Sequence, residues 1–262
     1  MSTQEKKTRI IRMVNRWNKI RWNHRKALRS FSSGAYFIIT PEDVKMWSDN
    51  HTKPEYIHCY IGIERRKMYL ILIDSETDKK PLTRLDNSEF EKVVIREFSN
   101  DLDIFTPDFI KGARDGSVTV NEALSRNLRW QLMKSSWISE QIESVRDMQV
   151  GIARVFASPF KDLENIVRAN PSGEIIAIMG LKANETFANN HPEEEQSPYQ
   201  LDLCFWGVNS NSQSVYPGAR ENKNTDSGPQ GQRGPSSPAP VEDLTLIAPP
   251  AKGGSFPLMH EQ

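Results

Sequence analysis

The first 34 residues carry the side chains whose chemistry is easiest to infer from the sequence. Ten of them are Lys or Arg and one is Glu, so the other 228 residues sum to a formal charge of −9 in a chain of zero net charge. Cationic side chains at helical spacing, interleaved with Trp17 and Trp22, suit phosphate contacts with base stacking. The candidate polyanion-binding residues are Arg9, Arg12, Arg16, Lys19, Arg21, Arg25, Lys26 and Arg29.

The same stretch has a second interpretation. From Thr8 to Phe31 the apolar residues recur at the spacing of one helix face, which predicts a basic amphipathic helix that ends at Ser32-Ser33-Gly34. The apolar face can pack on the acidic remainder of the chain and leave the basic face to solvent. A membrane surface or a partner protein is a third interpretation of the basic face.

Sequence motifs of common catalytic and metal sites are missing. The chain contains no GxxxxGK[ST], GxGxxG, GxSxG, HExxH or CxxC. Lys111–Glu122 has the Asp-Gly and the final Glu of a calcium-binding loop, but a lysine and an alanine replace its first two oxygen ligands. His191 and Glu193–Glu195 stand in a polar insertion, which is typical of a solvated loop. We therefore expect no metal, no cofactor and no catalytic residue.

An enzyme or a small-molecule sensor is the alternative, with a pocket between the two halves of the chain. It would use four polar side chains of a strongly apolar hairpin: His58, Tyr60, Tyr69 and Asp74. His58 cannot form a catalytic pair with its neighbour Cys59, because adjacent residues of a strand point to opposite faces.

The two cysteines, Cys59 and Cys204, both lie in apolar runs, as buried reduced thiols do. No secretory signal and no apolar run of membrane length is visible in the sequence. These features favour a cytoplasmic protein without a structural disulfide.

The elements that would position these side chains begin after the basic helix. Ala35–Ile39 is predicted as a strand, and Thr40-Pro41 opens a short helix because it combines an N-cap with a proline in the first turn. Tyr56–Ile63 and Met68–Asp74 are predicted as a β-hairpin from their alternating and apolar patterns.

This order of elements recurs later in the chain. Ala153–Leu181 repeats the 29 residues of Ala35–Ile63 at a constant offset of 118, and the hairpin continues after a polar insertion to Tyr199–Val208. The two copies share a glycine and a Ser/Thr-Pro helix start, but not the polar residues of the first hairpin. We interpret the echo as an internal duplication of architecture.

Two further helices are predicted between the copies. One runs from Asn87 or Ser88 through Phe98, with a strand at 92–96 as a competing assignment. The other is long, from Asn121 to about Met148, and carries an apolar stripe with two tryptophans.

The composition changes after Asn209 to Ser, Asn, Gln, Gly and Pro, and eight of the sixteen prolines lie at or after Pro217. Such a segment cannot bury enough apolar surface to offset its ordering entropy, so a disordered tail is predicted. Val241–Ile247 is an apolar and acidic island in this tail and a candidate docking peptide for a protein partner.

The pattern Tyr60-Ile61-Gly62-Ile63, followed by Tyr69–Asp74, resembles the hairpins of uncharacterised bacterial proteins. The resemblance is confined to this hairpin. It implies a bacterial origin and no activity, so it assigns a function to no residue.

The sequence thus predicts an α+β fold of two duplicated helix–strand–helix–β-hairpin modules, forming one mixed or antiparallel sheet packed against helices. The expected boundaries are 1–34 for the basic helix, 35–118 and 119–208 for the modules, and 209–262 for the tail. The expected function is non-enzymatic binding or interaction, with nucleic-acid binding and a small-molecule enzyme or sensor as alternatives.

Overall fold

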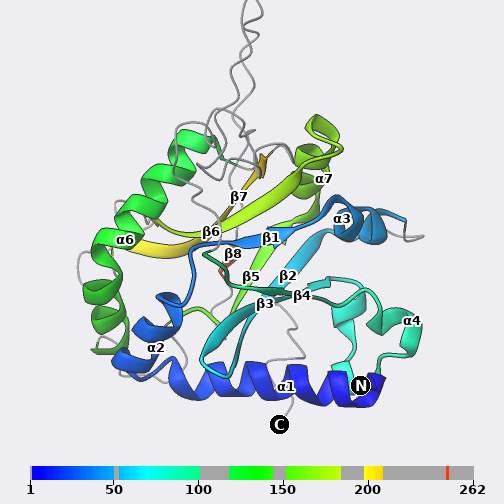
Figure 1. Cartoon of the computed structure of the whole chain (residues 1–262), viewed down its shortest axis with the longest axis horizontal. Coiled ribbons are helices and arrows are strands. Elements are labelled where there is room, and N and C mark those ends of the chain that lie inside the picture. The colour runs from blue at the N-terminus through cyan, green and yellow to red at the C-terminus, as the bar shows by residue number, and fades with distance from the viewer. Residues whose placement is uncertain are drawn as a thin grey trace, which may run out of the picture.

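The computed structural model describes residues 2–49, 53–100, 118–143, 152–183, 198–208 and 246–247. In chain order the elements are α1 (Thr3–Ile20), α2 (His24–Phe31), β1 (Phe37–Ile39), α3 (Pro41–Ser48), β2 (Tyr56–Glu64), β3 (Lys67–Asp74), the 3-10 turns η1 (Thr77–Lys79) and η2 (Leu82–Arg84), α4 (Asn87–Phe90), β4 (Val94–Glu97), α6 (Val120–Glu143), β5 (Val155–Pro159), α7 (Phe160–Ala169), β6 (Glu174–Ala183), β7 (Tyr199–Val208) and β8 (Leu246–Ile247). They form a mixed α+β fold (Figure 1).

The strands form two antiparallel sheets, of order β4-β3-β2-β5-β8 and β1-β6-β7. The expectation of a single sheet was wrong. The strands of both hairpins are buried on both faces over most of their length. One face of each hairpin therefore packs against the other sheet, and its opposite face is covered by other parts of the chain.

The two short strands are exchanged between the halves of the chain. β1 pairs with β6, with Phe37 opposite Ala177, whereas β5 pairs with β2, with Phe156 opposite Cys59. Each short strand therefore completes the sheet that contains the hairpin of the other half.

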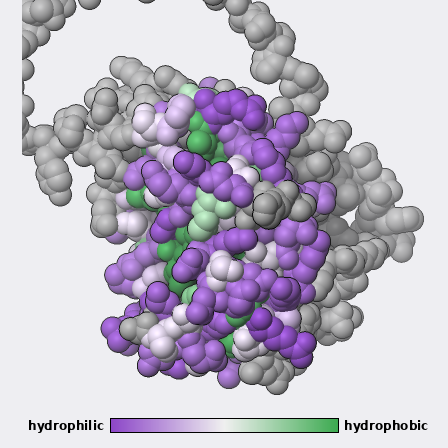
Figure 2. Space-filling model, turned by 90° about the vertical axis from the view of Figure 1, so that its right-hand side faces the viewer, coloured by the Kyte–Doolittle hydropathy of each residue, from purple (hydrophilic) through white to green (hydrophobic). Residues whose placement is uncertain are grey.

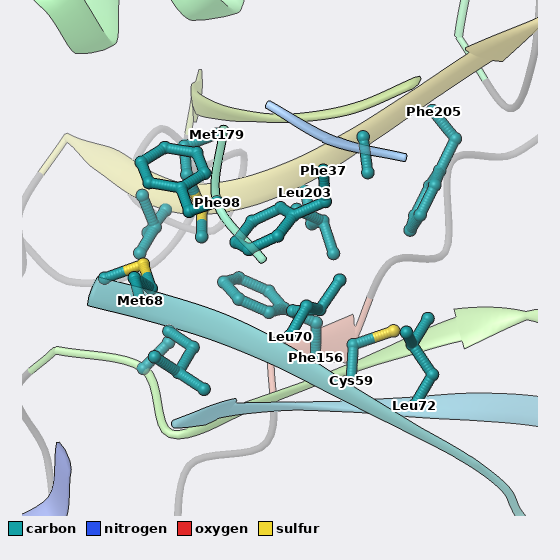
Figure 3. Packing of buried hydrophobic residues seen from close by; sticks show 14 of the residues in the cluster. Phe37, Cys59, Met68, Leu70, Leu72, Phe98, Phe156, Met179, Leu203 and Phe205 are labelled. Atoms are coloured by element: carbon teal, nitrogen blue, oxygen red, sulfur yellow. The ribbon is translucent and has the colours of Figure 1, made fainter. Parts of the chain in front are cut away.

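The main hydrophobic core lies between the two sheets. Phe37, Met179 and Leu203 extend from the three-stranded sheet toward Leu70 and Phe156 of the five-stranded sheet (Figure 3). Helix α1 covers the outer face of the five-stranded sheet together with α4, and the first half of α6 covers the outer face of the three-stranded sheet. The layers are therefore helix, sheet, sheet and helix.

The predicted N-terminal helix is broken into two. Helix α1 ends at Ile20, and the side chain of Asn23 then accepts a hydrogen bond from the backbone N–H of Lys26 and caps α2. The break lets α2 turn inward, so that Phe31 meets Trp17 edge to face at 5.4 Å between ring centroids and Trp130 at 4.9 Å.

The helix predicted through Phe98 was wrong beyond Phe90. Residues Val94–Glu97 form β4, the edge strand beside β3, with Val94 opposite Leu72. The β-branched residues in this stretch fit a pleated strand, and β3 is apolar on both faces and needs a neighbour on each side. The competing strand assignment at 92–96 is the one the structure adopts in most of that range.

The helix start predicted at Ser158-Pro159 is also wrong in part. Ser158 lies inside β5 with its side chain buried. Helix α7 begins at Phe160 without a side-chain cap. At the matching helix start, by contrast, Thr40 and Asp43 form the predicted reciprocal cap of α3.

The remaining strand predictions are confirmed, including both hairpins and β1 within Ala35–Ile39. The weak metal motifs at Lys111–Glu122 and His191–Glu195 lie largely or entirely outside the described residues, as does the tail apart from β8. Within the described ranges, none of the helices has the length and hydropathy to span a membrane.

Candidate polyanion-binding surface

Helix α1 lies with its apolar stripe against the sheet, so its basic flanks are turned outward. Ile10, Met13 and Val14 are buried against β2 and β3, and Figure 1 shows the helix along one side of this sheet. The orientation follows from the helical spacing of the apolar residues, as the sequence predicts.

Two of the eight candidate residues are used for packing. Arg9 donates from Nε and Nη2 to the Glu64 carboxylate, at 3.1 Å to Oε1 and 2.5 Å to Oε2. Arg21 is buried, and its guanidinium donates to the backbone carbonyl of Ile152 at 2.6 Å and lies 4.0 Å from the ring centroid of Trp22. Burial lowers the pKa of Arg21 to about 10, with a further contribution from Arg154. These contacts tie α1 and the α1–α2 junction to the protein itself.

The other six candidates are exposed, and within the described part of the chain none of them forms an ion pair. They are Arg12, Arg16, Lys19, Arg25, Lys26 and Arg29. The packing of the described residues thus leaves these six side chains at the surface.

Sequence reasoning missed two more arginines. Arg65 and Arg66 form the entire turn between β2 and β3, and both are exposed with positive φ, 48° and 71°. A two-residue hairpin turn with two left-handed residues normally carries Asn-Gly, because a Cβ is disfavoured there. The signal in the sequence was an Arg-Arg pair where a turn former is expected.

The turn lies beside α1. The Glu64 carboxylate at the end of β2 has a lowered pKa, chiefly through its hydrogen bonds to Arg9 and also through the nearby charges of Arg65 and Arg12. The eight exposed cations of α1, α2 and this turn are called the basic surface below: Arg12, Arg16, Lys19, Arg25, Lys26, Arg29, Arg65 and Arg66.

The expected aromatic partners of these cations are not both available. Trp17 is buried in the core, and its indole N–H donates to the carbonyl of Ala153 at 2.9 Å. Trp22 is partly exposed but has the Arg21 guanidinium on its ring. The idea of base stacking on Trp17 is therefore wrong.

The alternative enzyme site is a buried polar cluster. His58 Nδ1 and the Tyr60 hydroxyl both meet Oδ2 of Asp78, at 2.6 Å and 2.5 Å. Asp78, which sequence reasoning missed, is 3% exposed and reaches the sheet from the turn η1 after β3. Burial raises its pKa, while its hydrogen bonds to His58 and Tyr60 oppose that shift.

The other two residues of the alternative enzyme site stand apart from this cluster. Tyr69 is at the opposite end of β3 and donates to Glu97 at 3.2 Å, whereas Asp74 accepts the backbone N–H groups of Glu76 and Thr77 and so caps the following turn. Cys59 faces the core, where burial raises the pKa of its thiol to about 12. The cluster thus fastens the segment after β3 to the sheet and has no thiolate beside it.

A groove of about 450 Å³ lies between α3 and α7 on another part of the molecule. It is lined by Pro41, Glu42, Val44, Lys45, Ser48, Glu164, Val167, Arg168 and Pro171. Glu164 is already bound there by Ser48 at 2.8 Å and Lys53 at 2.7 Å. The side that carries α3 and α4 is mostly hydrophilic, with a narrow strip of apolar residues (Figure 2). The groove contains none of the four residues of the alternative enzyme site.

The described residues contain no cluster of three or more His, Cys, Asp or Glu side chains placed to hold a metal ion. No protein-family model matches the chain, and comparison with curated proteins and with solved structures finds no match. The function must therefore be argued from the geometry of these surfaces.

Proposed function

We propose that the protein is a non-enzymatic binding protein whose basic surface contacts a nucleic acid. The observation that carries the proposal is the set of eight exposed cations on α1, α2 and the β2–β3 turn, for which the described residues provide no ion-pair partner. Closely spaced phosphates neutralise such a surface and release condensed counterions, which gives a sequence-independent binding energy.

The backbone of the β2–β3 turn supports the same proposal. A left-handed conformation costs roughly 1–2 kcal/mol for a residue other than glycine, and both Arg65 and Arg66 adopt it. A pair of arginines at these positions gives up stability that Asn-Gly would provide. We therefore infer that the positive charge at this turn serves a function that outweighs the lost stability, since strained backbone is often found at functional positions.

We also propose that the scaffold arose by internal duplication with exchange of the first strand. Two pairings support this: Phe37 lies opposite Ala177, and Phe156 lies opposite Cys59. Cys59 and Ala177 correspond at the offset of 118, whereas Phe37 and Phe156 correspond at 119, so the short strand of the second copy is shifted by one residue. The two hairpin glycines also match, since a Cβ on Gly62 would lie 3.0 Å from Met13 Cβ and one on Gly180 2.7 Å from Arg126 Cβ. Each glycine lets a helix approach its sheet.

An experimental structure tests the duplication. Superposition of β1–α3–β2–β3 on β5–α7–β6–β7 should place Phe37 on Phe156 and Gly62 on Gly180 together. A superposition that matches the strands only with the glycines out of register would contradict it.

The binding proposal is tested by fluorescence anisotropy with labelled duplex DNA, single-stranded DNA and single-stranded RNA over a series of salt concentrations. We expect binding at low salt that weakens steeply as salt rises. Replacing Arg12, Arg16 and Lys19 by Gln should weaken binding to every sequence. It should also reduce the slope of log K against log salt by about 0.9 for each duplex phosphate that the variant no longer neutralises.

The matched control is Lys53→Gln with Lys80→Gln, which also removes exposed lysines but ones paired with Glu164 and Glu89. These two changes should leave affinity and slope near the wild-type values. Absence of binding to all three nucleic acids at low salt, or an equal reduction of affinity in the control, would refute the proposal.

A further inference from the structure

The outer edge of β5 offers backbone groups to another strand. On its inner side, Ile61 N–H donates to the Arg154 carbonyl and Phe160 N–H donates to the Glu55 carbonyl, each at 3.0 Å. The backbone N–H and C=O groups of successive strand residues point to alternate sides. The backbone groups of Phe156 and Ser158 therefore also point toward β2, while those of Val155, Ala157 and Pro159 point toward the open edge. Pro159 has no N–H to donate, as is usual at a sheet edge.

A segment from the far end of the chain occupies this edge. β8 pairs antiparallel with β5, with Leu246 opposite Ala157 and Ile247 opposite Phe156. The backbone groups of Ala157 point toward the open edge, so Ala157 and Leu246 form the pair that exchanges backbone hydrogen bonds. In Figure 1, β8 lies next to β5.

The occupant belongs to the apolar and acidic island Val241–Ile247. The sequence of this island has the β-branched and leucine content of a strand, in contrast to the Ser-, Gly- and Pro-rich residues before it. The chain between Val208 and Leu246 is also long enough, at about 3.3–3.6 Å per extended residue, to bring the island back to its own sheet.

We infer that the outer edge of β5 is a strand-docking site and that its occupant is the Val241–Ile247 island of the same chain. Backbone hydrogen bonds give such an edge its affinity for any extended apolar segment. β8 thus acts as a removable strand, and an extended apolar peptide from outside gains access to β5 only when β8 leaves.

Disulfide trapping in the full chain tests the occupant. Opposite residues of a hydrogen-bonded antiparallel pair have Cα atoms about 5.5 Å apart, within the range of a disulfide. Ala157→Cys with Leu246→Cys should therefore form an intramolecular disulfide under mild oxidation, seen as a faster monomer band on a non-reducing gel. Ala157→Cys with Ile247→Cys is the matched control, because neighbouring strand residues point to opposite faces.

Each possible outcome of the trapping experiment has a different meaning. A covalent dimer would overturn the assignment to the same chain, and equal trapping in both double variants, or none in either, would overturn the pairing itself. Cys59 and Cys204 are buried in the wild-type chain and leave the readout to the introduced pair.

Peptide binding tests the edge itself. Leu246→Pro removes the N–H that faces Ala157, so a labelled peptide of sequence Val241–Ile247 should bind this full-length variant at least tenfold more tightly than wild type. Leu258→Pro, an equal change outside the island, should behave as wild type. Equal binding to wild type and Leu246→Pro, or no binding to either, would show that the edge does not accept a strand.

Discussion

Arg9 and Glu64 form a two-point ion pair that joins α1 to the end of β2, and Arg12 and Arg65 lie close enough to stabilise the same carboxylate. One negative charge is thus set among three guanidinium groups. This corner of the molecule keeps an excess of positive charge, and the Glu64 carboxylate occupies a place that a phosphate oxygen could take.

Removal of that carboxylate should strengthen nucleic-acid binding. Glu64→Gln frees Arg9 and deletes a like charge to phosphate, so we expect severalfold tighter binding and a steeper salt dependence in the anisotropy assay. Glu89→Gln removes a carboxylate that pairs with Lys80 away from the basic surface and should change neither. Unchanged or weaker binding of Glu64→Gln would argue against contact at this corner.

The Arg9–Glu64 pair predicts a pH dependence of stability. The carboxyl pKa of Glu64 is lowered from its ordinary value of 4.5, so the pair contributes stability above that value and loses it as pH falls through the folded-state pKa. Because both side chains are about a third exposed, solvent screening limits this contribution to about 1 kcal/mol or less.

The measurement is urea unfolding of wild type and Arg9→Gln between pH 7 and pH 3. Wild type should be the more stable at pH 7, and the difference should start to shrink below the ordinary Glu pKa and disappear below the folded-state pKa. A difference that stays constant over the whole range would assign the effect of Arg9 to packing of its aliphatic stem.

A change in the β2–β3 turn should affect stability and nucleic-acid binding in opposite directions. Arg65→Asn with Arg66→Gly supplies the residues that this turn prefers, so we expect about 1–2 kcal/mol more stability and a higher Tm. The same change deletes two cations and should weaken nucleic-acid binding.

Arg66→Lys is the control for the turn, because it keeps both the charge and the disfavoured conformation. It should leave the melting temperature and the affinity close to wild type. A turn variant that binds as tightly as wild type would remove Arg65 and Arg66 from the basic surface.

A buried ion pair fixes α6 on the three-stranded sheet. Arg126 Nη1 donates to Oδ2 of Asp202 at 2.6 Å, and both side chains are buried. Asp202→Ala leaves the guanidinium without this partner and should cost about 3–5 kcal/mol in urea unfolding. Glu122→Ala removes the partly exposed second carboxylate of Arg126 and should cost less than about 1 kcal/mol. Similar losses of stability in the two variants would contradict the importance of burial.

Local patterns were enough to predict most elements but not their partners. The Thr40 cap and the limits of Tyr199–Val208 follow from residues close together in the sequence. The stacking of two sheets and the pairing of Phe37 with Ala177 depend on contacts between distant segments, which a periodicity does not specify. Ser158 is a second example. Its sequence context favours a helix start, but in the structure it pairs with Ile57 of β2 and lies in a strand.

The candidate site was predicted in part for a similar reason. Helical spacing identifies which face of α1 is basic. It does not show that Arg9 forms an ion pair with Glu64 or that Arg21 donates to a backbone carbonyl. Asp78 was missed because it lies twenty residues after His58, in a charged loop with no pattern of its own. Arg65 and Arg66 lie between the two predicted strands of the hairpin, but their positive φ angles can be seen only in the structure.

The exchange of β1 and β5 bears on how the chain folds during synthesis. When the first hairpin leaves the ribosome, the strand that will flank β2 has not yet been made, and β1 must wait for β6 before it finds a partner. Pairings of such large sequence separation are slow to form and leave strand edges open to other nascent chains in the meantime. Translation order thus makes β6 the element whose arrival allows the N-terminal half to complete its folding.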